Sequence, residues 1–212
     1  MHTIPYGGLL ASRLAAGETV LISGATGNLG SSAVTVALAM GAGHVVTPGR
    51  NRAALDLLAD RFGPRVSPVE LSGDEDTDRA SMAAATDGPI DIVLVLLPPQ
   101  APSSAARAAA MTVREYGRGC ADGWRRHARR RGPRPALPLD HAQLGDRTRP
   151  MDVPTHGERR HDPTHRDGAP WTFTPEHVTR FDLDQVNDAV THAATHGAPF
   201  DRTVANGKCG PA

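Results

Sequence analysis

The sequence predicts an α/β fold, in which a parallel β-sheet is flanked by helices. Along residues 1–117, short runs of β-branched and aliphatic residues alternate with segments of helical length. Strands that alternate with such helices pair in parallel, because each helix carries the chain back across the sheet. A glycine-rich segment directly follows the first apolar run. This combination is typical of a domain that binds a ligand where its strands end.

The expected strands are short and apolar. The runs at 19–23 and 90–97 consist almost wholly of β-branched and aliphatic residues, as strands buried on both faces do. Two further runs, at 44–47 and 66–71, complete the set of four. Aromatic residues make up only 4% of the chain, so we expect a core built from Ala, Val, Leu and Ile.

Helices are expected between these strands. Residues 51–62 place apolar side chains on one face, and residues 74–86 begin with acidic residues that suit the positive end of a helix. A lead-in helix is expected at 9–16, and others at 31–41 and 101–113. Taken together, the elements predict a Rossmann-type sheet with flanking helices.

Residues 24–30, Gly-Ala-Thr-Gly-Asn-Leu-Gly, join the first strand to the next helix. Their spacing is that of a GxGxxG turn with Ala in the first position. Gly27 would let the backbone approach a diphosphate, and Gly30 would let the helix pack closely on the strand. The alternative is a turn whose glycines only permit tight packing. The predicted cofactor-binding residues of this turn are Gly24, Ala25, Thr26, Gly27, Asn28, Leu29 and Gly30.

The end of the second strand indicates which nucleotide is preferred. NAD sites usually place Asp or Glu there to bind the ribose 2′-hydroxyl, whereas this chain has Gly49, Arg50 and Asn51. A guanidinium at Arg50 would pair with the 2′-phosphate of NADP. We therefore expect NADP as the cofactor, with NAD as the second choice and a solvated Arg50 as the alternative interpretation.

Residues 16–42, AGETVLISGATGNLGSSAVTVALAMGA, resemble the cofactor domain of medium-chain dehydrogenases, the superfamily of zinc-type alcohol dehydrogenases and quinone reductases. Residues 181–193, FDLDQVNDAVTHA, also match, and the resemblance covers roughly residues 5–118 and 172–204. It implies hydride transfer between a nicotinamide and an alcohol, carbonyl or quinone carbon. In zinc-dependent members the metal ligands come mostly from an N-terminal barrel-like domain. We expect this chain to lack that domain, to carry no catalytic residue or zinc ligand, and to be inactive alone.

A second interpretation is a non-catalytic NAD(P)-binding or sensor protein of the atypical short-chain dehydrogenase type, which also uses a GATGxxG turn. Reductases of that group need a Tyr-x-x-x-Lys pair, in which Lys lowers the tyrosine pKa. Tyr6 is followed at the fourth position by Leu10, and Tyr116 by Cys120. The pair is therefore absent from the sequence.

Residues 119–170 are rich in Arg and Pro, and we expect them to be irregular. They contain only four branched aliphatic residues, too few to offset the entropy of ordering the segment. A basic nucleic-acid-binding insert, a metal site at His161 and His165, and a shifted reading frame all account for this composition, and we favour the last. The expected organisation is a Rossmann-type domain at 1–118, this segment, and a C-terminal helix and tail of the same domain at 171–212.

Charge and composition exclude several kinds of partner. The formal net charge is +0, which argues against general binding to nucleic acid or to anionic membranes. No apolar run reaches the length of a membrane span, and the two cysteines are far apart and form no CxxC pair. We expect a cytoplasmic protein whose partner is a nicotinamide dinucleotide. The dimer contact of the resembled family would be impaired, because residues 119–170 stand where that contact is expected.

Overall fold

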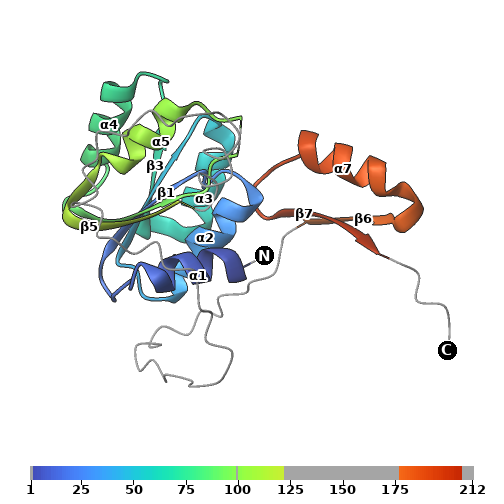
Figure 1. Cartoon of the computed structure of the whole chain (residues 1–212), viewed down its shortest axis with the longest axis horizontal. Coiled ribbons are helices and arrows are strands. Elements are labelled where there is room, and N and C mark those ends of the chain that lie inside the picture. Colours follow the sequence, from blue (N-terminus) through green and yellow to red (C-terminus); the bar gives the residue numbers. More distant parts are fainter. Residues whose placement is uncertain (1, 99, 122–176, 207–212) are drawn as a thin grey trace, which may run out of the picture.

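The computed structural model describes residues 2–98, 100–121 and 177–206 (Figure 1). Five strands form one parallel sheet in the order β3-β2-β1-β4-β5. Their bounds are β1 Thr19–Ser23, β2 His44–Gly49, β3 Val66–Glu70, β4 Ile90–Val95 and β5 Val113–Ala121. The predicted Rossmann-type α/β fold is therefore confirmed.

Helices cover both faces of this sheet. On one face lie α1 (Thr3–Ala11), α2 (Asn28–Ala39) and α3 (Arg52–Phe62), and on the other lie α4 (Glu75–Ala84) and α5 (Ser103–Ala110). A short 3-10 turn, η1 (Gly63–Arg65), connects α3 to β3. Successive residues of β1 point to opposite faces of the sheet and so contact different layers of helices. Val20 and Ile22 pack with the first group of helices, whereas Leu21 packs with the second.

Local sequence determines where two of the helices begin. The Asn51 side chain accepts a hydrogen bond from the amide of Ala54 (3.2 Å), which caps α3. The Asp74 side chain accepts one from the amide of Thr77 (2.9 Å), which caps α4. Each cap satisfies an amide that has no acceptor inside its own helix. The predicted helices at 51–62 and 74–86 therefore form with small changes at their ends.

The lead-in helix lies earlier than predicted, at Thr3–Ala11 rather than at 9–16. It ends because Arg13 adopts a left-handed conformation with φ 53°. Gly7 and Gly8 lower the helix propensity of this segment, since glycine is a poor helix former. In the fold Gly8 is useful, because an added Cβ would lie 3.2 Å from Leu94 and 3.4 Å from the Cys120 sulfur. The missing side chain lets α1 approach the sheet.

Two other element boundaries differ from the prediction. The helix expected at 101–113 ends at Ala110, and β5 begins at Val113. This strand continues through residues 119–121, where Gly119 pairs with Val93 and Cys120 with Leu94. The boundary predicted at residue 118 is therefore wrong, because pairing with β4 extends the strand past it. The remainder of the segment predicted to be irregular, 122–170, lies outside the described residues.

The second strand is longer than predicted and runs to Gly49 despite Pro48. Proline lacks an amide and is usually excluded from central strands. Here the pairing of β2 with β1 extends only to Val46, whereas its pairing with β3 continues to Gly49. Pro48 therefore lies beyond the residues that pair on both sides.

Residues 177–206, called here the C-terminal unit, form a separate strand–helix–strand arrangement (Figure 1). Strands β6 (His177–Asp182) and β7 (Asp201–Asn206) pair in parallel, and α7 (Val186–Thr195) connects them after the turn η2 (Leu183–Gln185). The sequence predicted the helix but neither strand. Both strands are short and largely polar, so no apolar pattern marked them.

Two neighbouring leucines of α3 test this packing. Leu58 is fully buried in the core, whereas Leu57 is 40% exposed. We expect Leu58→Ala to lower the free energy of unfolding by about 2–5 kcal/mol, the usual cost of truncating a buried leucine. The matched Leu57→Ala variant should lose less than about 1 kcal/mol, since it leaves no enclosed cavity. Urea unfolding followed by circular dichroism measures both, and equal losses would contradict the described packing.

Candidate functional site

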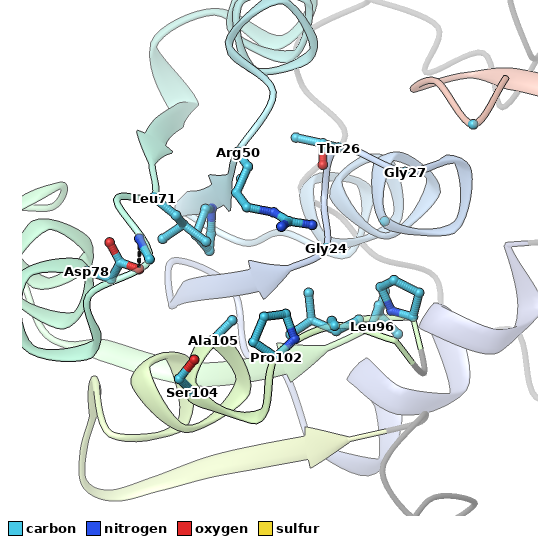
Figure 2. A pocket seen from close by; sticks show the side chains of 18 of the residues that line it. Gly24, Thr26, Gly27, Arg50, Leu71, Asp78, Leu96, Pro102, Ser104 and Ala105 are labelled. Carbon is cyan, nitrogen blue, oxygen red and sulfur yellow. Dashed lines mark hydrogen bonds between the residues drawn. The ribbon is translucent and has the colours of Figure 1, made fainter. Parts of the chain in front are cut away.

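A cleft of about 600 Å³ lies where β1, β2 and β4 end (Figure 2). It occupies the point at which the chain crosses from one half of the parallel sheet to the other, since β1 lies between β2 and β4. Ligands of open α/β sheets bind at this position. The lining residues come from the turn after β1, the ends of β2, β3 and β4, the starts of α4 and α5, and Gly197 of the C-terminal unit.

The first turn of α2 faces this cleft with free amides. The amide of Ser31 donates to the carbonyl of Gly27 (2.8 Å), which begins the helical hydrogen-bond ladder. The amides of Asn28 and Leu29 precede that ladder, and no side chain caps the helix. These amides and the helix dipole place partial positive charge at the cleft. Helix α2 thus begins at Asn28, three residues before the predicted start, so Asn28 to Gly30 belong to the helix rather than to a loop.

Two glycines of the turn have different steric surroundings. An added Cβ at Gly30 would overlap the carbonyl oxygen of Gly24 and lie 2.6 Å from the Cα of Ala25, so α2 contacts β1 only because Gly30 lacks one. An added Cβ at Gly27 would meet a single protein atom, at 3.7 Å. The space beside Gly27 is therefore open to the cleft, and the absence of a side chain there leaves room for a ligand.

Of the other predicted residues of the turn, Gly24 and Thr26 line the cleft and Ala25 does not. Gly24 lines the cleft with φ 92°, and its Cβ would lie 2.8 Å from the carbonyl oxygen of Leu96. Thr26 also lines it, and its methyl group occupies the space that a side chain at Gly49 would need. Ala25, in contrast, is fully buried in the core and does not line the cleft. The turn directs its methyl group inward, and its contact with a cofactor stays a prediction.

Arg50 lies at the end of β2 and is exposed. Figure 2 shows its side chain extending from β2 across the cleft toward the turn. None of the ion pairs among the described residues involves Arg50, so its guanidinium is available to a ligand. Asn51 does not line the cleft, because its side chain caps α3 as described above.

The opposite wall carries two carboxylates that the sequence analysis did not single out. Asp78 is only 3% exposed and accepts hydrogen bonds from the Ser72 amide (2.7 Å), the Ser72 hydroxyl (2.8 Å) and the Gly73 amide (3.1 Å). Glu75 binds Arg107 with both oxygens, at 2.7 and 2.9 Å from its Nε. This hydrogen bond lowers the pKa of the Glu75 carboxyl. Both carboxylates thus have hydrogen-bond partners within the protein. The Ser-Gly-Asp sequence at 72–74 was the signal that could have indicated the buried position of Asp78.

Within residues 2–98, 100–121 and 177–206, no group of three His, Cys, Asp or Glu side chains could hold a metal ion. In the same part of the chain, no helix has both the length and the apolar character of a membrane span.

Comparison with known proteins gives structural matches only. No protein-family profile and no curated protein matches the sequence. An alcohol dehydrogenase of Sinorhizobium meliloti 1021, described as putative, is similar over 67% of this chain and 35% of its own, with 25% identity and a TM-score of 0.50. Alcohol dehydrogenase TADH from Thermus sp. ATN1 matches over 57% and 33%, with 26% identity and a TM-score of 0.48. The nucleotide-binding subdomain of the PpsC enoylreductase domain from Mycobacterium tuberculosis matches over 56% and 62%, with 30% identity and a TM-score of 0.45.

The similarity to medium-chain dehydrogenases is confirmed. The alcohol dehydrogenase from Sinorhizobium meliloti 1021, with its TM-score of 0.50, supports an oxidoreductase fold for this chain. The chain spans about a third of the length of the alcohol dehydrogenases it matches.

The two glycines of the turn provide a matched test of this geometry. We expect Gly30→Ala to lower the free energy of unfolding by about 3 kcal/mol, because backbone atoms must move to admit the methyl group. Gly27→Ala should lose less than about 1 kcal/mol, through the weaker N-cap preference of alanine. Chemical unfolding of both variants measures the difference. A Gly30→Ala protein as stable as the wild type would contradict the close contact between α2 and β1.

Proposed function

We propose that this chain binds a nicotinamide dinucleotide, NADP in preference to NAD, as the nucleotide-binding part of an oxidoreductase of the medium-chain dehydrogenase type. The uncapped start of α2 at the end of β1 is the observation that carries this proposal. A diphosphate is the ligand chemistry that suits free amides at a helix start. The open space at Gly27 allows such a group to approach the backbone.

The charges around the cleft support a dinucleotide that bears a third phosphate. Asp78 and Glu75 are held by hydrogen bonds to the protein, while no ion pair among the described residues involves Arg50. NAD sites commonly use a carboxylate at the end of the second strand, where this chain has Arg50. A guanidinium there binds the 2′-phosphate of NADP with charge-assisted hydrogen bonds.

In this role the chain binds and orients the nucleotide. The bound dinucleotide would supply the hydride chemistry, which in the resembled superfamily links the nicotinamide to an alcohol, carbonyl or quinone carbon. Residues Asn28 and Leu29 would hold the diphosphate through their amides, and Leu71 and Pro102 would provide apolar surface on the adenosine side. We assign no catalytic residue among those that line the cleft.

A substitution at Gly27 tests whether the cleft binds a dinucleotide. We expect Gly27→Val to weaken NADP by tenfold or more, about 1.4 kcal/mol, because its side chain occupies the path of the diphosphate. The same substitution at Gly88 is a suitable control, since nothing lies within 4 Å of an added Cβ there and Gly88 does not line the cleft. Isothermal titration calorimetry of both variants measures the effect. Unchanged affinity in Gly27→Val would remove the turn from the binding site.

Substitution of Arg50 tests the preference between the two nucleotides. We expect Arg50→Ala to weaken NADP by about 1.5–3 kcal/mol, the range for hydrogen bonds to charged groups, and to leave NAD affinity unchanged. Arg52→Ala provides the matched control, because Arg52 pairs with Asp56 and does not line the cleft. Calorimetric titrations with each nucleotide distinguish these cases. Equal losses for NADP and NAD would place Arg50 outside the 2′-phosphate site.

A further inference from the structure

The C-terminal unit contacts the first turn of α2 through a buried hydrogen bond. The backbone amide of Phe200 donates to the Ser31 hydroxyl oxygen at 3.1 Å. That hydroxyl in turn donates to the carbonyl of Asn28 at 3.0 Å. Ser31 therefore connects the last part of the described chain to the residues that present free amides to the cleft.

The Phe200 side chain fixes this contact. Its ring is 7% exposed and belongs to the core beneath α2 and α3. It lies 5.8 Å from the ring of Phe62, and the Arg61 guanidinium lies 3.9 Å from its centroid. Phe200 also has φ 61°, a left-handed conformation that non-glycine residues rarely adopt. The surrounding contacts must offset this strain, which is typical of segments that position a site.

The loop before Phe200 reaches the cleft. Helix α7 ends at Thr195, and Gly197 lines the cleft together with the glycine turn. In Figure 2 the C-terminal unit enters the view on the side of Gly27, opposite Leu71 and Asp78. The C-terminal unit thus contributes Gly197 to the cleft on the side of the turn, and not at the end where Leu71 and Asp78 lie.

We propose that Phe200 is a positioning residue for the dinucleotide, which seats the loop at 196–199 as a wall over the diphosphate turn. The inference rests on the proposed function, since it assigns a role in the same cleft. Two contacts carry the effect: the Phe200 ring anchors the loop in the core, and its amide holds Ser31 and hence the first turn of α2. Binding of the dinucleotide and seating of the loop then favour each other by the same factor.

The test compares two ligands that differ in length. NADP extends past the glycine turn, whereas adenosine 2′-monophosphate (2′-AMP) occupies only the adenosine end and brings no 5′-phosphate to the turn. We expect Phe200→Ala to weaken NADP about fivefold or more, within the usual range of coupling between sites, and to change 2′-AMP affinity by less than about twofold. Val190→Ala is the control, because Val190 is an exposed residue of α7 away from the cleft. Calorimetry on the full chain measures all of these affinities.

A second variant and a second measurement distinguish a loss of positioning from a loss of folding. Ser31→Ala removes the acceptor of the Phe200 amide but keeps the Phe200 ring, and it should show the same selective loss of NADP affinity. Hydrogen exchange of the Phe200 amide should slow when NADP is added to the wild-type chain and should not slow with 2′-AMP. Circular dichroism identifies any variant that has not folded.

The outcomes separate the two proposals. A wild-type chain that binds neither NADP nor NAD overturns the proposed function, and this inference with it. A wild-type chain that binds NADP, with Phe200→Ala and Ser31→Ala binding it equally well, overturns only the role of Phe200. Equal losses for NADP and 2′-AMP in the folded variants also overturn it, because a merely structural role affects both ligands alike.

Discussion

The contact between the start of α2 and the end of β1 is the constraint on which the rest of the site depends. It requires the missing Cβ at Gly30, because the carbonyl of Gly24 occupies that volume. With the helix in this position, the free amides of its first turn point into the cleft between the strand ends. The positive φ of Gly24 and its proximity to the Leu96 carbonyl fix the turn in the same arrangement. A feature of packing thereby also creates the partial charge that a diphosphate would need.

The electrostatics of the cleft follow from which charged groups the fold has already paired. The chain has a formal net charge of +0, so no overall attraction to an anion exists. Asp78 is held by Ser72 and Gly73, and Glu75 by Arg107, so neither carboxylate faces the cleft without a partner. Preference for an anionic ligand therefore depends on local amides and on Arg50, and not on the composition of the chain.

The C-terminal unit depends on the larger sheet for its position. A pair of strands is at best marginally stable alone and needs further packing. Insertion of the Phe200 ring beside Phe62 buries an apolar group of this unit in the main core. Its amide reaches Ser31, so the two parts of the chain share a contact next to the cleft. The resemblance at 181–193 belongs to this unit, whose strands lie outside the sheet that the rest of the family motif describes.

The sequence by itself determined the elements whose signals are local: the aliphatic strand β1, the capped helix at Arg52–Phe62, and the glycine turn with Arg50 after β2. The sequence placed the start of strand β5 in a predicted helix, and it predicted neither strand of the C-terminal unit. The direction of Ala25, the inward-facing Asp78 and the anchoring of Phe200 also became apparent only in the tertiary structure. The reason is physical: periodicity, caps and turn residues act within a few positions, whereas strand pairing and the contact from Phe200 to Ser31 join residues far apart in the chain.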